Sequence, residues 1–83
     1  MHHFYRNAAL LGLAYLEARI LKDEDMVHHI RSLTPAAELK VSINQAVLYI
    51  TQAMSNYTDI DIDSPLEAIQ KTRHSLIKQI INI

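Results

Sequence analysis

The sequence predicts an all-α fold, a small helical bundle of three long helices and one short helix. The chain of 83 residues contains one glycine and two prolines, which are too few for the turns of a many-stranded β fold. Apolar residues make up 49% of the chain and recur at helical spacings of three and four. Because a chain of this length buries only about 60–65% of its unfolded surface, we expect residues 1–83 to form one domain with a small core.

The first predicted helix covers residues 3–21, and its apolar side chains extend around nearly its whole circumference. A helix of this kind is buried on several sides, and so short a chain offers few other helices to cover it. We therefore predict that a second copy of the chain covers part of this helix, so that dimerisation completes the bundle. The residues predicted at this dimer interface are Leu10, Leu13, Tyr15, Leu16 and Ile20.

Gly12 lies in the middle of this apolar helix, close to Ala8 and Ala9. A glycine costs about 1 kcal/mol relative to alanine in a helix interior. Two interpretations remain open at this stage. Either the helix tolerates the glycine, or the glycine allows a second helix to approach closely.

The second predicted helix is short and covers residues 24–33. Asp23, Glu24 and Asp25 lie at its start, where negative charge stabilises a helix N-terminus. No glycine or proline separates this helix from the first, so one continuous helix is an alternative. We favour a bend at residues 22–24.

Thr34 and Pro35 predict the start of the third helix, with Thr34 as N-cap and Pro35 as the first helical residue. The helix is expected to end near residue 56. Three heptads without regular flanking charges indicate a bundle helix rather than a long coiled coil. Its apolar seam consists of Leu39, Ile43, Ala46, Ile50, Ala53 and Tyr57.

A capping box predicts the start of the fourth helix, which covers residues 65–81. Ser64 is placed to accept a hydrogen bond from the backbone N–H of Glu67, and the Glu67 carboxylate is placed to accept from the N–H of Ser64. Pro65 between them occupies the first helical position, where its missing N–H does no harm.

Three aspartates before this capping box, Asp59, Asp61 and Asp63, match the first ligand positions of an EF-hand calcium loop. Such a loop needs glycine at its sixth position and a bidentate glutamate at its twelfth, where this chain has Ser64 and Gln70. We therefore interpret the aspartates as an acidic joint before the helix. We predict no metal and no cofactor.

The second helix carries a cluster of titratable side chains, Glu24, Asp25, His28 and His29. Each carboxylate lies four residues before a histidine, so both pairs can meet on the helix surface. A carboxylate–histidine pair is half of a metal site or of an acid–base pair. However, adjacent histidines diverge by about 100° on a helix. We favour surface histidines paired with carboxylates, and a metal-dependent enzyme remains a remote alternative.

The last helix carries a basic strip, in which Lys71, His74 and Lys78 lie on one face at steps of three and four. Arg73 lies about 100° from His74, within the apolar seam of the same helix. An arginine in such a seam usually extends its charged head to solvent, and less often marks a buried pair or a contact with a partner. The strip is either a solvated polar face or a docking surface for an acidic protein or a nucleic-acid backbone. If it docks a partner, Lys71, Arg73, His74 and Lys78 are the predicted contact residues.

The net charge of −1 lowers the expectation of a dedicated DNA-binding protein, which normally carries a clear basic excess. No phosphate loop, nucleophile motif or helical zinc motif occurs. The leading hypothesis is a small non-enzymatic protein-interaction module, such as an adaptor, inhibitor, immunity or regulatory factor. The alternative is a dimeric nucleic-acid-binding regulator that uses the basic face of the last helix.

The chain contains no cysteine, which excludes disulfides and thiolate metal sites and fits a reducing compartment. The apolar run at residues 8–16 is too short to span a bilayer, which needs about 20 residues. It also lacks a good signal-peptide cleavage site. We therefore expect a cytoplasmic protein.

Overall fold

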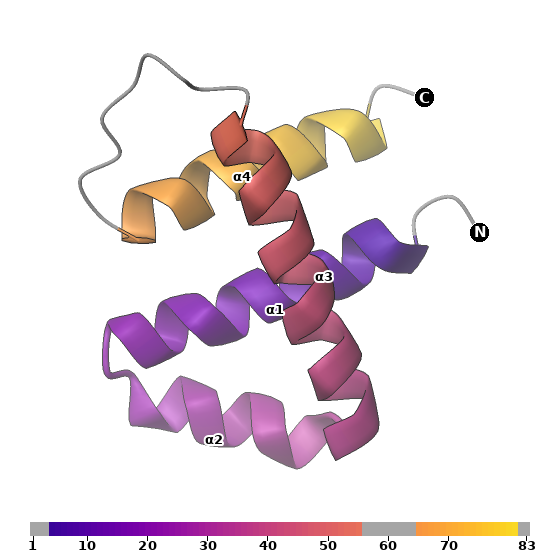
Figure 1. Cartoon of the computed structure of the whole chain (residues 1–83). Coiled ribbons are helices and arrows are strands. Elements are labelled where there is room, and N and C mark those ends of the chain that lie inside the picture. Colours follow the sequence, from indigo (N-terminus) through magenta and orange to yellow (C-terminus); the bar gives the residue numbers. More distant parts are fainter. Residues whose placement is uncertain (1–3, 56–64, 82–83) are drawn as a thin grey trace.

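The computed structural model describes residues 4–55 and 65–81, and within these ranges it contains four helices and no strand. The helices are α1 (Phe4–Ile20), α2 (Glu24–Leu33), α3 (Ala36–Ser55) and α4 (Pro65–Ile81), as Figure 1 shows. The predicted all-α bundle of three long helices and one short helix is confirmed. The predicted capping box at Ser64, and the aspartates before it, lie outside the described residues. Dimerisation stays a prediction.

α1 and α3 cross at the centre of the molecule (Figure 1). At this crossing, Gly12 of α1 lies against the backbone of α3 at Ser42. A Cβ atom on Gly12 would overlap the carbonyl oxygen of Ser42 and would lie 2.6 Å from its carbonyl carbon. The same atom would lie 2.9 Å from the Cβ of Ala46. Only glycine fits this contact, so the interpretation of Gly12 as a site of close helix approach is confirmed.

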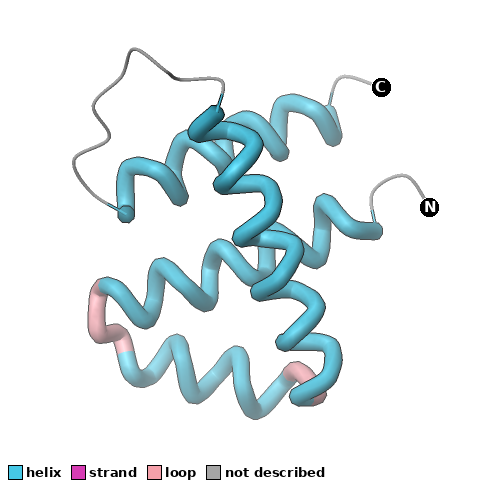
Figure 2. The backbone as a smooth tube through the Cα atoms, in the orientation of Figure 1, coloured by secondary structure: helices cyan, strands magenta, loops and turns pink. Residues whose placement is uncertain are grey.

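The other two helices pack around this crossing. α2 packs against the second half of α1, where Tyr15, Ile30 and Leu39 form one buried cluster. α4 contacts both α1 and α3 and closes the main core (Figure 2). That core consists of Ala9, Leu13, Ala46, Ile69 and Leu76.

α4 runs antiparallel to α1 and is joined to it by polar contacts at both ends. Near the start of α1, Arg6 Nε donates to Gln79 Oε1 at 3.1 Å. Further along α1, the Arg73 guanidinium forms an ion pair with the Glu17 carboxylate at 3.2 Å. Both contacts agree with this antiparallel direction, in which Ile69 and Leu76 of α4 pack in the main core.

The joint between α1 and α2 is a sharp bend at Lys22, as expected at residues 22–24. The backbone N–H of Lys22 donates to the carbonyl oxygen of Arg19 at 3.2 Å, and that of Asp23 donates to the carbonyl oxygen of Ala18 at 2.9 Å. This pair of bonds is the Schellman pattern of a helix end. Lys22 has φ 58°, the left-handed conformation that glycine normally supplies there. Asp23 then caps α2, because its Oδ1 accepts from Met26 N–H at 3.2 Å.

We expect Lys22→Gly to stabilise the protein by about 1 kcal/mol. Lysine at a left-handed position pays a steric cost of roughly 1–2 kcal/mol, which glycine avoids, while the greater freedom of glycine in the unfolded chain offsets part of the gain. Urea unfolding monitored by circular dichroism measures the change. Lys22→Ala is the matched control and should give no comparable gain, because alanine keeps the Cβ. An equal gain from both variants would contradict the steric explanation.

α3 begins at Ala36, one residue later than predicted. The carbonyl of Pro35 accepts the N–H of Leu39 at 2.9 Å. Thr34 has an extended backbone, with φ −122° and ψ 121°. A proline disfavours helical geometry in the residue before it, so Thr34 ends α2 and lets the chain turn into α3.

Candidate functional site

The predicted basic strip of α4 is partly neutralised by the chain itself. The two terminal nitrogens of Arg73 lie 3.2 Å from the two carboxylate oxygens of Glu17, and both side chains are half-buried. Lys71 forms an ion pair with Glu67 at 3.4 Å. His74 and Lys78 are exposed. Arg73 is therefore paired at a half-buried position rather than extended into solvent, and the four residues do not form one field of unpaired cations.

The four titratable side chains of the α2 cluster are exposed. Glu24, Asp25, His28 and His29 all lie on the outside of the helix. Within residues 4–55 and 65–81, neither predicted carboxylate–histidine pair forms an ion pair. In the same ranges, no group of three or more histidine, cysteine or acidic side chains is placed to hold a metal ion.

The residues predicted at a dimer interface lie in different environments. Leu13 is 0% exposed and Tyr15 is 5% exposed, so the chain itself buries both of them. Leu10 and Leu16 are half-buried and pack against the main core. Only Ile20 is exposed. The prediction therefore needs correction at Leu13 and Tyr15, because α2, α3 and α4 already cover α1 on several sides.

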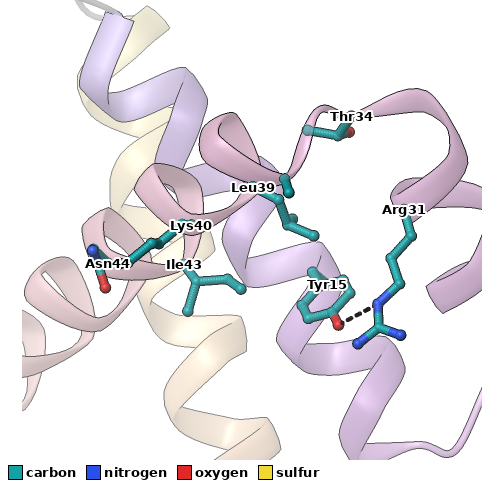
Figure 3. Close-up of a pocket in the computed structure, with 8 residues that line it drawn as sticks. Tyr15, Arg31, Thr34, Leu39, Lys40, Ile43 and Asn44 are labelled. Carbon is teal, nitrogen blue, oxygen red and sulfur yellow. Dashed lines mark hydrogen bonds between the residues drawn. The ribbon is translucent and has the colours of Figure 1, made fainter.

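A pocket of about 460 Å³ lies between the second half of α1, the end of α2 and the first half of α3 (Figure 3). Tyr15 contributes its phenol from α1, and Arg31 reaches it from α2. Arg31 Nε donates to the Tyr15 hydroxyl oxygen at 3.0 Å, and the guanidinium carbon lies 5.8 Å from the centre of the ring. The other residues that line the pocket are Thr34, Ala36, Leu39, Lys40, Ile43 and Asn44.

The hydroxyl of Tyr15 lies between two guanidinium groups. Its oxygen also accepts a longer hydrogen bond, 3.4 Å, from Arg19 Nη1. Burial raises the pKa of the Tyr15 phenol, but the hydrogen bonds and positive charges of Arg19 and Arg31 lower it by more. The pKa therefore lies below its ordinary value of 10.0.

This pKa predicts a pH dependence that Tyr15→Phe should abolish. The folded protein releases the phenol proton at a lower pH than the unfolded chain, so between the two pKa values the unfolded state binds more protons. The free energy of unfolding of the wild type, relative to Tyr15→Phe, should therefore rise with pH through this window and level off above about pH 10. Urea unfolding of both proteins at a series of pH values measures the difference.

Phenolate absorbance gives an independent check. The difference between the titration curves of the wild type and Tyr15→Phe isolates the Tyr15 phenol, and its midpoint should lie below pH 10. Arg31→Gln removes one of the two cations and should move this midpoint upward. A midpoint at or above pH 10 in the wild type would contradict the assigned contacts.

Sequence reasoning missed the Tyr15 pocket because its two key groups are distant in the chain. The sequence pattern predicts Tyr15 at an apolar dimer interface, and nothing in the pattern around Arg31 predicts a contact with it. Arg19 follows Tyr15 by four residues, so one of the two contacts follows from helical spacing. The contact with Arg31 spans 16 residues and depends on the bend at Lys22.

A second groove of about 530 Å³ lies between the first half of α1 and the first half of α3. Four of its lining residues come from α1 at helical spacings, and four come from α3. Its apolar side chains include exposed ones, with Phe4 at 61% and Val41 at 41%. The lining residues are Phe4, Asn7, Ala8, Leu11, Ala37, Glu38, Val41 and Ser42.

Comparison with known proteins gives no indication of function, so a functional proposal must be argued from this geometry. No family model matches the sequence, and no curated protein or solved structure matches the chain significantly. Among the helices of the described residues, none is long and apolar enough to cross a membrane.

Proposed function

We propose that the protein is a small non-enzymatic interaction module, which binds a helix of a protein partner in the groove between the first halves of α1 and α3. Helix-in-groove docking is one of the recurring modes by which adaptors, inhibitors and regulatory factors bind partner proteins. The observation that carries the proposal is the groove itself, an apolar space between two core helices that no helix of the described chain fills.

The crossing of α1 and α3 explains why this space exists. Two helices that touch at one point diverge on both sides and leave wedges between them. α2 and α4 pack along the other parts of the crossing, whereas no helix of residues 4–55 and 65–81 lies on the side between the two N-terminal halves (Figure 1). α2 shows that a helix fits into a space of this kind. It packs Val27 and Ile30 against α1 in the neighbouring space between α1 and α3.

The chemistry of the groove suits an amphipathic helix. Phe4, Ala8 and Leu11 follow one face of α1 at steps of four and three, which matches the ridges of a packed helix. Asn7 and Glu38 supply polar groups among the apolar residues. Grooves with apolar walls and a few polar groups bind partner helices through apolar anchors at helical spacings.

The nucleic-acid alternative has weaker support. Binding to a duplex depends on cations that neutralise phosphates. On α4, Arg73 and Lys71 each already lie against a carboxylate of the chain. Their use by a phosphate would require those ion pairs to break first.

Site-specific photo-crosslinking in the source cell tests the proposal. A photoreactive residue in place of Val41 should capture one defined protein, and the same residue in place of the exposed Gln70 on α4 should not. Phe4→Glu, which adds a charge to the groove wall, should reduce the yield at position 41 at least about tenfold, because a charge buried in an apolar interface is strongly disfavoured. Equal capture at positions 41 and 70, or no capture at 41, would contradict the proposal.

The partner could also be a second copy of the chain, and experiments on the purified protein alone can test this. If the groove binds another copy, sedimentation equilibrium should show a dimer whose dissociation constant rises in Val41→Glu but not in Gln70→Glu. A cytoplasmic location is part of the same proposal, in keeping with a chain that contains no cysteine.

A further inference from the structure

We infer that the pocket beside Tyr15 binds a small organic anion, in which a carboxylate or phosphate group is carried on an apolar body. This inference is independent of the proposed function. The pocket uses Leu39, Lys40 and Ile43 of α3, whereas the partner groove uses Glu38 and Val41. At 100° per residue these two sets lie on opposite faces of the helix.

The size and floor of the pocket fit a small molecule. Its volume of about 460 Å³ falls within the range of roughly 300–1,000 Å³ that is typical of small-molecule sites. Leu39 and Ile43, one helical turn apart, both point toward Tyr15 (Figure 3). Together with Ala36 they give the pocket an apolar wall against which a hydrocarbon or aromatic group can pack.

The polar groups of the pocket are arranged as donors. Arg31 uses Nε on Tyr15, and no described residue accepts a hydrogen bond from its two terminal nitrogens, so their N–H groups can donate to a ligand. The Tyr15 hydroxyl oxygen already accepts hydrogen bonds from Arg31 and Arg19. The hydroxyl can therefore only donate its O–H to a ligand. Lys40 adds three further N–H donors.

Among the described residues, no carboxylate lines the pocket to balance this charge. The eight lining residues include Arg31 and Lys40 but no aspartate or glutamate. Within the part of the chain that the structure describes, neither cation forms an ion pair with an acidic side chain. A recess of one sign of charge attracts ligands of the opposite sign, so the pocket is unsuited to a metal cation and suited to an anion.

The anchoring of Arg31 distinguishes it from an ordinary surface arginine. Its guanidinium is held on the ring and the hydroxyl of a buried tyrosine. A guanidinium held in one orientation loses less entropy when it forms paired hydrogen bonds with a carboxylate or phosphate. An anion without an apolar body would not cover Ala36, which is exposed, or Ile43, which is half-buried.

Nuclear magnetic resonance titration of the whole isotope-labelled chain tests the inference with four probes. Phenylacetate and phenyl phosphate are apolar anions, phenylacetamide is the neutral counterpart, and inorganic phosphate is an anion without an apolar body. At least one apolar anion should cause saturable shifts in the amides of Thr34, Lys40 and Ile43. Phenylacetamide and inorganic phosphate should each bind at least about tenfold more weakly, because each lacks one of the two complementary parts.

Matched charge variants locate the site. Arg31→Gln and Lys40→Gln should each raise the dissociation constant for the bound anion, the first by about tenfold or more. Lys78→Gln removes an exposed cation from α4 and should change it by less than about twofold. The spectra also show whether each variant is folded. Equal losses in Arg31→Gln and Lys78→Gln, equal binding of phenylacetamide, or no saturable shift at the pocket with either apolar anion would overturn the inference.

Discussion

Gly12→Ala is expected to destabilise the protein by about 3 kcal/mol, at the upper end of the cost of overpacking a core. The added methyl group would overlap the backbone carbonyl of Ser42, and a backbone group cannot change rotamer to make room. α1 and α3 would have to separate along their whole contact. The loss should be seen even though alanine is the better helix former by about 1 kcal/mol. Urea unfolding monitored by circular dichroism measures it.

Two further variants separate overpacking from a general effect of mutating α1. Asn7→Ala places the same alanine on an exposed position of α1, where we expect a change of less than about 0.5 kcal/mol. Ala46→Gly, combined with Gly12→Ala, removes the side chain at 2.9 Å but leaves the Ser42 carbonyl in place. The double variant should therefore regain little of the stability that Gly12→Ala loses. Recovery to wild-type stability would show that the Ala46 side chain, and not the α3 backbone, limits the approach.

Features set by neighbouring residues were predictable from the sequence. Pro35 marks the turn between α2 and α3 because proline restricts its own backbone and that of Thr34. Asp23 at the start of α2 caps it through a contact only three residues long. These interactions form within one helical turn, so they depend little on the rest of the fold.

Features set by distant residues were not predictable in the same way. The role of Gly12 depends on Ser42 of another helix. The partner of Arg73 is Glu17, which lies 56 residues away in the chain. Nothing in the local sequence distinguishes an arginine that extends to solvent from one that meets a carboxylate on another helix.

The apolar density of α1 was interpreted correctly as burial on several sides, but the covering surface was assigned in part to a second copy. Within the described residues, α1 is the central helix and contacts α2, α3 and α4. An excess of apolar side chains marks a central helix and an interface helix alike. Exposed apolar residues remain on the outside of the bundle, including Phe4, Val41 and Leu48. These residues, and not Leu13 or Tyr15, are available to a partner.

Leu13→Ala distinguishes a core residue from an interface residue, and we expect it to cost about 3 kcal/mol. Leu13 is 0% exposed within one chain and belongs to the main core, so the substitution removes buried methyl groups and leaves a cavity. Leucine-to-alanine changes at such sites cost roughly 2–5 kcal/mol. A domain of this size is stable by on the order of 5–10 kcal/mol. The variant should therefore unfold at a much lower urea concentration than the wild type.

The dependence on protein concentration decides between the two roles of Leu13. If the chain alone buries Leu13, the loss of stability should be the same at low and high protein concentration. If a second copy buried it, the loss would grow with concentration, because only the wild type would gain stability from association. Leu48→Ala makes the same chemical change at a side chain that is 55% exposed, and should cost less than about 0.5 kcal/mol. If Leu13→Ala lost no more stability than Leu48→Ala, Leu13 would not be a core residue. Truncating a buried leucine should cost far more than truncating an exposed one.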